Sequence, residues 1–196
     1  MLKRLCDILV SAVALIVLSP LLLVLCTGVV LDSGFPIFFS QIRVGRCFGR
    51  FRLWKFRSMQ TSTTGPSITV SGDRRVTRLG GILRRAKLDE LPQFWNVLRG
   101  DMSLVGPRPE VPEYVDLFKE RYRTILTVRP GITDPASIHF RNEEEILSRS
   151  AEPLTEYAER ILPAKLDLAE EYVKTRTAFG DICILLRTAT SIVRGH

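Results

Sequence analysis

Two adjacent carboxylates, Asp89 and Glu90, stand among closely spaced cations. Arg84, Arg85 and Lys87 precede them within a few residues. Acids in the first turn of a helix favour the helix dipole, so the pair alone predicts only a solvated helix start. Guanidinium and ammonium groups are, however, the side chains that bind phosphate oxygens. The chemistry that these residue types could perform together is the handling of a phosphate ester.

Two more basic segments strengthen this interpretation. Lys-Phe-Arg-Ser-Met occupies 55–59, and Pro-Arg-Pro occupies 107–109. An arginine fork grips phosphate in a bidentate fashion, and the two prolines limit the backbone freedom of Arg108 and aim its side chain. Without the other cations, such a loop would be merely a stiff turn.

Length and composition restrict the class of protein. A chain of 196 residues can bury one core, as one compact domain or as a small domain with an attached helical element, so we expect one active site. A net charge of +7 favours phosphate esters, nucleic acid or anionic lipid as partner. The cysteines are too widely spaced to indicate a zinc site or a disulfide framework. With two histidines, a metal would need carboxylate or other oxygen ligands.

The segment from Ile8 to Leu31 contains no charged residue. As a helix it is long enough to cross a hydrocarbon core of about 30 Å. A buried core helix is the first alternative, but so small a domain could hardly cover the segment on every side. A cleaved signal peptide is the second, but the run exceeds the usual apolar region and no persuasive cleavage site follows. Membrane insertion is the preferred interpretation.

The flanks of this segment are informative about its topology. Lys3 and Arg4 precede it, and a heavier basic cluster spans 43–57, so both ends read as cytoplasmic. Ser19-Pro20 lies at the midpoint, where proline removes a backbone donor and Ser19 could bond a freed carbonyl. We therefore expect a re-entrant helical hairpin. A proline within an ordinary spanning helix remains the alternative.

The rest of the chain predicts an α-rich α+β fold. The aromatic and arginine-rich stretch 33–59 has both strand and interfacial character, and 60–73 is a polar loop. A basic amphipathic helix is expected after Asp73, and a second helix runs from near Pro92 to near Gly100. Further helices are expected within 111–126 and 143–175, and an amphipathic one at 181–194.

Residues 87–110, Lys-Leu-Asp-Glu-Leu-Pro-Gln-Phe-Trp-Asn-Val-Leu-Arg-Gly-Asp-Met-Ser-Leu-Val-Gly-Pro-Arg-Pro-Glu, resemble the signature of the bacterial sugar transferase family, the monotopic phosphoglycosyl transferases. Lys55–Met59 and Arg-Pro-Gly-Ile-Thr at 129–133 extend the resemblance over nearly the whole chain, whose length matches the minimal catalytic form of that family. The resemblance implies a re-entrant membrane helix at 1–32 and a catalytic domain at 33–196. It places this domain on the cytoplasmic face of the bacterial inner membrane, with surface amphipathic helices.

The resemblance also implies a reaction. Asp89 would be the nucleophile that attacks the sugar-linked phosphate of a UDP-sugar and releases UMP, and polyprenyl (undecaprenyl) phosphate would then take the phospho-sugar. This is the first membrane step in assembling a glycoconjugate. Glu90, with Asp89, would hold Mg²⁺. The residues that match the family's phosphate ligands are Lys55, Arg84, Arg108 and Arg141. Ser19 and Pro20 match the kink of its membrane helix.

The sequence departs from the family pattern in two places. The stretch 134–142 differs from the usual residues although Arg141 and Asn142 stay in register, which leaves the donor sugar open. His139 in this stretch is interpreted as a loop residue, because attack by a phosphate anion needs little proton removal. An acidic position expected in 165–173 matches Asp167, Glu170 or Glu171, and we leave it unassigned.

Two other classes of function compete with this interpretation. The first is a non-catalytic membrane adaptor whose basic face holds anionic lipid or polymer, and it predicts no special role for Asp89. The second is a nucleic-acid binder, but no nucleic-acid-binding motif is evident and the apolar N-terminus argues against it. We therefore expect no nucleic-acid partner. The sugar, the prenyl chain, the pathway and the oligomeric state stay open.

Overall fold

The computed structural model describes residues 2–60, 69–70 and 72–194, the last three of these by their backbone only. Most of the predicted polar loop at 60–73 lies outside the described residues. The helices are α1 Leu2–Val17, α2 Ser19–Ser33, η1 Arg46–Phe48, α3 Arg78–Arg85, η2 Leu88–Glu90, α4 Gln93–Arg99, α5 Pro112–Leu117, α6 Lys119–Ile125, α7 Pro135–His139, α8 Glu143–Ser148, α9 Pro153–Glu156, η3 Tyr157–Ile161, α10 Leu162–Thr175 and α11 Ala178–Arg194. The strands are β1 Phe38–Val44, β2 Arg50–Phe56, β3 Ser103–Val105 and β4 Gly131–Thr133. The predicted helix-rich α+β class is confirmed.

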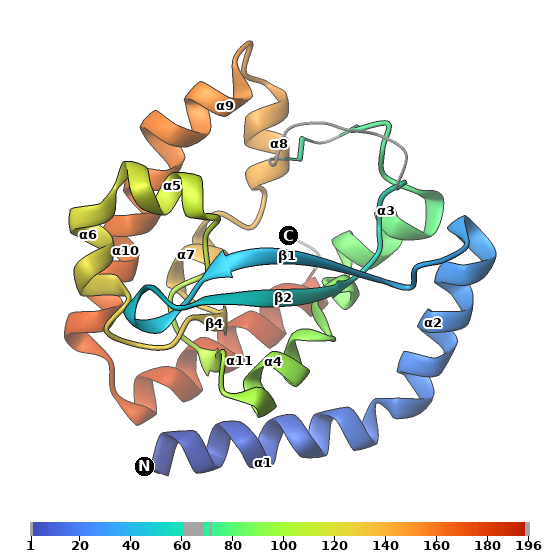
Figure 1. Ribbon diagram of the computed structural model, residues 1–196, viewed down its shortest axis with the longest axis horizontal. Helices are drawn as coiled ribbons and strands as arrows, with labels where there is room; N and C mark the ends of the chain where they lie inside the picture. The colour runs from blue at the N-terminus through green and yellow to red at the C-terminus, as the bar shows by residue number, and fades with distance from the viewer. Residues whose placement is uncertain (1, 61–68, 71, 195–196) are drawn as a thin grey trace.

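The apolar N-terminal segment forms two helices that meet at an angle of 63° (Figure 1). The break lies at Leu18, just before Pro20, whose missing N–H leaves the carbonyl of Ile16 without its helical donor. Ser19 Oγ donates to that carbonyl at 2.7 Å, as the sequence predicted. No single helix in the described ranges is long and apolar enough to cross a membrane, whereas α1 and α2 meet that test together.

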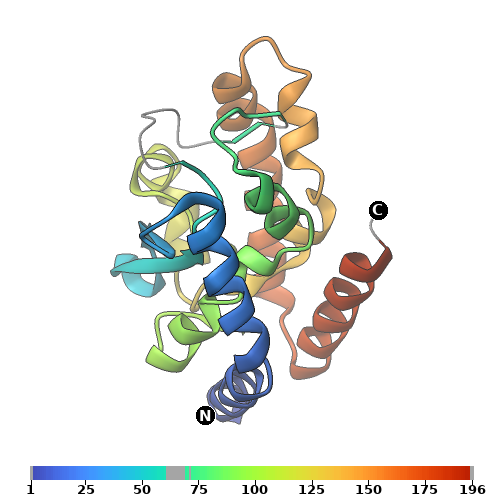
Figure 2. The same ribbon diagram turned by 90° about the vertical axis from the view of Figure 1, so that its right-hand side faces the viewer.

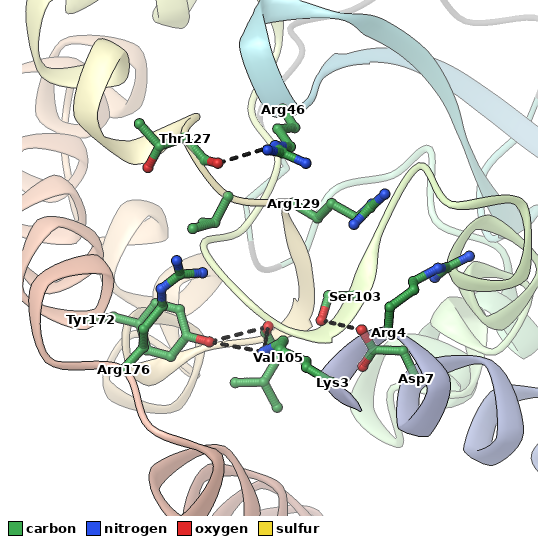
Figure 3. Close-up of a pocket in the computed structure, with 11 residues that line it drawn as sticks. Lys3, Arg4, Asp7, Arg46, Ser103, Val105, Thr127, Arg129, Tyr172 and Arg176 are labelled. Carbon is green, nitrogen blue, oxygen red and sulfur yellow. Dashed lines mark hydrogen bonds between the residues drawn. The ribbon is translucent and has the colours of Figure 1, made fainter. Parts of the chain in front are cut away.

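Polar residues of the first turns dock α1 on the rest of the molecule (Figure 3). The buried carboxylate of Asp7 accepts hydrogen bonds from Ser103 Oγ at 2.9 Å and from the Leu104 N–H at 3.2 Å. Arg4 donates to the carbonyls of Val97 and Leu98 near the end of α4. Helix α1 therefore lies along α4 and β3 and leaves its outer apolar side chains exposed.

Strands β1 and β2 form an antiparallel hairpin in which Phe38 pairs with Phe56 and Val44 with Arg50. The strand interpretation of the aromatic segment is thus confirmed. Side chains alternate along a strand, so Leu53 and Lys55 of β2 share one face. Leu53 packs there on Val97 of α4, and Lys55 is consequently directed toward the beginning of that helix.

The parallel pair β3–β4 was not predicted, because each strand has only three residues and the two lie far apart in the sequence. The backbones of the two segments approach closely at Gly106 and Gly131. A Cβ on Gly131 would lie 2.1 Å from the backbone nitrogen of Gly106. This position therefore requires glycine.

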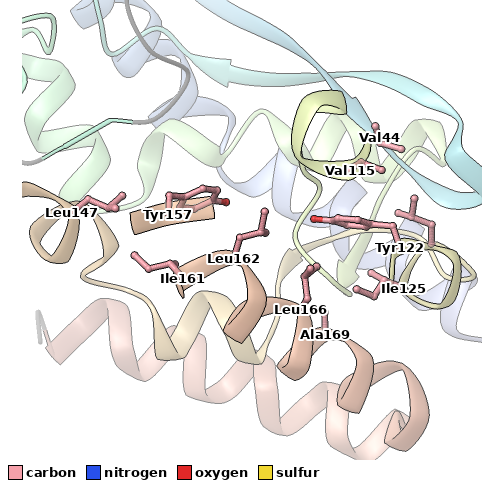
Figure 4. Packing of buried hydrophobic residues seen from close by; sticks show 11 residues of the cluster. Val44, Val115, Tyr122, Ile125, Leu147, Tyr157, Ile161, Leu162, Leu166 and Ala169 are labelled. Carbon is pink, nitrogen blue, oxygen red and sulfur yellow. The ribbon is translucent and has the colours of Figure 1, made fainter. Parts of the chain in front are cut away.

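The largest core lies between α5–α6 and α10 (Figure 4). Tyr122 and Ile125 of α6 contact the apolar face of α10, including Leu162 and Leu166. Helix α11 lies on another side of the molecule, next to α7 and the β3–β4 pair (Figure 2).

The helix expected after Asp73 begins later than predicted, at Arg78. Its N-cap is Thr77, whose hydroxyl accepts from the Gly80 N–H at 2.9 Å. Val76 instead forms an isolated β-bridge with Met59, and its N–H closes a turn by donating to the Asp73 carbonyl at 3.0 Å. Tertiary pairing therefore overrides the helical periodicity that Val76 seemed to begin.

Candidate active site

Asp89 and Glu90 lie in the short 3₁₀ helix η2, between α3 and α4. Their exposed fractions are 6% and 9%, so a solvated helix start does not describe them. Lys87 precedes the turn in the left-handed conformation, with φ of 56°. Pro92 is the N-cap of α4 and Gly100 its C-cap, so the helix begins and ends near the residues that the sequence predicted. The turn thus presents two buried carboxylates side by side.

Glu90 is held between two cations. Its Oε1 accepts from Lys55 Nζ at 2.9 Å and from an Arg108 guanidinium nitrogen at 2.5 Å. Burial alone would raise the pKa of Glu90, but the attraction of Arg108 and Lys55 holds this pKa well below its ordinary value. Glu90 is therefore ionised and fixed.

Asp89 is less fully paired than Glu90. One oxygen lies 4.0 Å from Lys55 Nζ, and the other, Oδ1, is buried without a hydrogen bond from any described residue. Burial raises the pKa of Asp89, the charge of Glu90 adds to the rise, and Lys55 and Lys87 partly offset it. An unpartnered buried carboxylate oxygen indicates a group that binds or reacts with something absent from the chain itself.

A backbone hydrogen bond helps the two flanking prolines to orient Arg108. The Arg108 N–H donates to Asp134 Oδ2 at 3.1 Å, and the other oxygen of Asp134 caps α7 by accepting from the Ser137 N–H at 2.7 Å. Asp134 therefore links α7 to the Arg108 loop. The stretch that departs from the family pattern thus includes a residue that positions the site, a role the sequence did not reveal.

The other two predicted phosphate ligands, Arg84 and Arg141, form no ion pair with either carboxylate in the described part of the chain. Arg84 forms an ion pair with Glu144 at 2.5 Å, and its charge still lowers the pKa of Asp89 slightly. Arg141 has a buried guanidinium nitrogen that bonds to no described residue. It lines the same cavity as Glu90 and Arg108.

This cavity has a volume of about 370 Å³ and lies between η2, the α7–α8 segment and α11. Its polar wall is basic on balance, and its other wall is apolar. The lining comprises Lys87, Glu90, Leu91, Phe94, Leu104, Arg108, Ile132, Thr133, Ser137, Ile138, Phe140, Arg141, Glu143, Glu144, Lys165, Leu185, Thr188, Ala189 and Ser191. Asp89 does not line the cavity but adjoins Glu90, which does.

Sequence reasoning missed two residues of this site. Lys165 of α10 lines the cavity and forms an ion pair with Glu143, a contact that no local pattern signals. Asn96 of α4 is fully buried, and its amide donates to the Arg52 carbonyl and accepts from the Trp54 N–H. This clamp fixes β2, and with it Lys55, against the carboxylate turn. Asn96 is buried together with Gln93 and Val97 on one face of α4, and no local pattern signalled this contact.

A divalent cation at this site would need ligands from its substrate. The described residues contain no group of three or more His, Cys, Asp or Glu side chains that could hold a metal. Mg²⁺ is, however, commonly bound by one or two carboxylates together with substrate phosphates. The free oxygen of Asp89 beside Glu90 fits that arrangement.

The residues left open by the sequence lie elsewhere. Asp167 and Glu170 both pair with Arg121, and Glu171 is exposed; none of the three lines the cavity. The structure therefore gives none of them a contact with this site. His139 is the last residue of α7 rather than a loop residue, because Asp134 caps a short helix there.

Comparison with known proteins identifies the family of the chain. Residues 1–195 match the family described as bacterial sugar transferase. The chain belongs to the bacterial sugar transferase family. Among curated members, it is 37% identical over 98% of its length to the UDP-N-acetylgalactosamine-undecaprenyl-phosphate N-acetylgalactosaminephosphotransferase of Aeromonas hydrophila. It is also 36% and 35% identical to the UDP-glucose:undecaprenyl-phosphate glucose-1-phosphate transferases of Caulobacter vibrioides and Escherichia coli, over 97% and 96% of its length.

The bacterial sugar transferases that it matches are mostly longer proteins. The chain spans 44% of the Aeromonas relative, 39% of the Escherichia relative and 69% of the Caulobacter relative. The family match at residues 1–195 includes all the predicted site residues.

Proposed function

We propose that this chain is a phosphoglycosyl transferase that moves a sugar-1-phosphate from a UDP-sugar to a polyprenyl phosphate, with undecaprenyl phosphate as the acceptor, and releases UMP. The observation that carries this proposal is the buried, unpartnered Oδ1 of Asp89 beside a basic cavity. The names of the relatives support the substrates, because all three act on a UDP-sugar and undecaprenyl phosphate.

Asp89 acts as the nucleophile in this proposal. Its carboxylate attacks the phosphorus that carries the sugar, the bond from that phosphorus to the oxygen of UMP breaks, and UMP leaves with the electron pair. Asp89 then carries the phospho-sugar as an acyl phosphate. The phosphate oxygen of the lipid attacks the same phosphorus and releases the Asp89 carboxylate.

The surrounding residues fit the charge demands of these steps. Arg108 and Lys55 are held near the carboxylates by Glu90, and Arg141 offers a free guanidinium nitrogen across the cavity. Cations fixed in advance around a transferring phosphate lower the barrier without having to reorganise. Glu90 and Asp89 would hold Mg²⁺ with the donor, and the ion would neutralise further phosphate oxygens.

The same proposal includes attachment to the membrane. The 63° bend between α1 and α2, and their exposed apolar side chains, are consistent with a helix pair that enters and leaves one face of the bilayer. Basic residues at both flanks favour the cytoplasmic face of the bacterial inner membrane. The catalytic domain at 33–196 would then meet a lipid acceptor at the surface.

The decisive experiment uses donor without acceptor. Purified protein in detergent is incubated with each of a panel of UDP-sugars, including UDP-glucose and UDP-N-acetylgalactosamine, and analysed by intact-protein mass spectrometry. We expect one added phospho-sugar mass, UMP release in equal amount, and loss of both in Asp89→Asn. Asp116→Asn, which changes an exposed acid of α5, is the matched control and should keep the adduct. Near-normal turnover by Asp89→Asn would rule out the covalent mechanism.

A further inference from the structure

A second cavity, of about 260 Å³, lies at the amino-terminal end of α1 (Figure 3). It is separate from the cavity that Glu90 lines and shares no lining residue with it. Its wall includes one acid, Asp7, and cations from four parts of the chain: Lys3, Arg4, Arg46, Arg129 and Arg176. Such a concentration of like charge around a hollow needs a physical reason.

Part of this charge has a structural role. Arg4 donates to the carbonyls of Val97 and Leu98, and Arg129 Nε donates to the Gly100 carbonyl at 2.8 Å. All three carbonyls lie at the C-terminal end of α4, where cations favour the helix dipole. Lys3 pairs with Asp181 of α11. These contacts account for the position of three cations but not for the hollow between them.

The remaining guanidinium donors have no partner among the residues that the structure describes. Arg46 and Arg129 each place Nε on a carbonyl, and their terminal guanidinium nitrogens form no hydrogen bond or ion pair within the described residues. Arg176 forms none at all in that part of the chain. Both oxygens of Asp7 accept from Ser103 and Leu104, and this acid forms no ion pair with the arginines of the described residues. Free guanidinium forks facing one hollow match the oxygens of a phosphate group.

Exposed apolar side chains adjoin these cations along the chain. Leu2 and Leu5 flank Lys3 and Arg4, Phe48 follows Arg46 by two residues, and Phe179 follows Arg176 by three. Cations bordered by exposed aromatic and aliphatic side chains are typical of the headgroup level of a bilayer. These apolar neighbours therefore favour a lipid, rather than a dissolved compound, as the molecule that carries the phosphate.

We propose that this cavity binds the phosphate of an anionic phospholipid headgroup, at a site distinct from the site of phosphoryl transfer. Because Arg4 and Arg129 also hold the end of α4, an occupied cavity joins lipid, α1 and the helix that follows Asp89 and Glu90. The bound headgroup would set the orientation of the domain on the bilayer. The inference does not depend on which reaction the protein catalyses.

The test measures binding of short-chain lipids to the full chain in neutral detergent, by isothermal titration calorimetry. The probes are dihexanoyl phosphatidylglycerol, dihexanoyl phosphatidylcholine and inorganic phosphate. The test variant is Arg46→Gln/Arg176→Gln. The control is Arg149→Gln/Arg160→Gln, which removes the same charge from exposed ion pairs on α8 and η3. Thermal melts confirm that both variants fold.

We expect saturable binding of phosphatidylglycerol to wild type, tighter than binding of the other two probes. The test variant should lose at least about tenfold in affinity, because each basic residue near an anionic lipid surface contributes roughly fivefold. The control should change less than about twofold. Equal losses in both variants would mean diffuse attraction and overturn the site, as would an absence of saturable binding. Equal affinity for inorganic phosphate and phosphatidylglycerol would overturn the lipid as its source.

Discussion

Lys87 is the cation nearest to Asp89 along the chain, and the sequence analysis gave it no specific role. It lines the cavity next to Glu90 and Arg108, and its charge lowers the pKa of Asp89. It also adopts the left-handed conformation that starts the carboxylate turn. One residue thus contributes both to the shape of the turn and to the charge state of the proposed nucleophile.

Replacing Lys87 by methionine should move the pH profile of the enzyme. Asp89 must be ionised to attack, so activity is lost as pH falls through its pKa, which burial already raises above the ordinary value. Removal of a nearby positive charge raises that pKa further, and the acid limb of kcat/KM should move to higher pH. Arg85→Met removes an exposed charge from α3 and is the control. An acid limb of kcat/KM that does not move in either variant, or that moves equally in both, would contradict the role of Lys87 in setting the pKa of Asp89.

Glu90 has two proposed tasks, to hold Lys55 and Arg108 and to bind Mg²⁺ with the donor. Excess chelator should abolish turnover by wild type. Glu90→Gln should need a much higher Mg²⁺ concentration for half-maximal activity, because a neutral amide oxygen binds the ion more weakly than a carboxylate. Glu143→Gln, in the same cavity wall, should leave that concentration unchanged. Full activity in chelator would exclude the metal from the mechanism.

At the level of elements, α4 connects the membrane segment to the site. Its first turn follows the carboxylates, and its last carbonyls accept from Arg4 and Arg129. Between them Asn96 clamps β2, which carries Lys55. A displacement of α1 would therefore reach the site through a single rigid helix.

The bend between α1 and α2 should depend on Pro20. Pro20→Ala restores an N–H to the Ile16 carbonyl and favours a straight helix, which would be long enough to span the bilayer. The measurement is labelling of a cysteine placed before Lys3, in a variant without the four native cysteines, by a membrane-impermeant thiol reagent in intact cells. The parent should be protected until the cells are permeabilised, and Pro20→Ala should increase labelling in intact cells.

Two outcomes would change this view of the bend. Labelling of the parent in intact cells would mean that the segment truly spans the membrane. Protection of both proteins would mean that proline does not cause the turn. The bond from Ser19 Oγ and the docking of Asp7 would then be sufficient to hold it.

At the scale of the whole molecule, the short β3–β4 pair separates the two cavities. Ser103 and Val105 line the basic cavity at α1, and Leu104 and Ile132 line the cavity beside Glu90. Alternation along a strand directs neighbouring side chains to opposite faces, so three residues of β3 can serve both. We therefore expect both the stability and the activity of the protein to depend strongly on this short strand pair.

Gly131→Ala tests that dependence. The added Cβ would lie 2.1 Å from the Gly106 nitrogen, so the strands must separate, and we expect a loss of at least about 2 kcal/mol in stability together with a large loss of activity. The melting temperature in detergent and the transferase rate are the measurements. Gly81→Ala, inside α3 with its nearest neighbour at 3.9 Å, should be neutral or slightly stabilising. Equal melting temperatures for the two variants would contradict the argument.

Local features of the sequence were sufficient to predict the helical segments, the kink at Ser19-Pro20 and the aromatic strands. These follow from helical periodicity, from the missing proline N–H and from the aromatic content of the segment, all of which are properties of residues close in the chain. The sequence also identified Asp89, Glu90, Lys55 and Arg108 as candidates, because their motifs resemble one family. Their roles in the reaction remain predictions.

Only the tertiary structure decided how these residues are paired and what surrounds them. The clamp of Glu90 between Lys55 and Arg108 joins residues 35 and 18 positions apart, and Asp134 reaches Arg108 across 26. Burial, which raises the pKa of Asp89, and the two cavities on either side of β3–β4 likewise arise from packing of distant segments. No local pattern encodes such contacts, because their energy depends on which surfaces meet when the whole chain is folded.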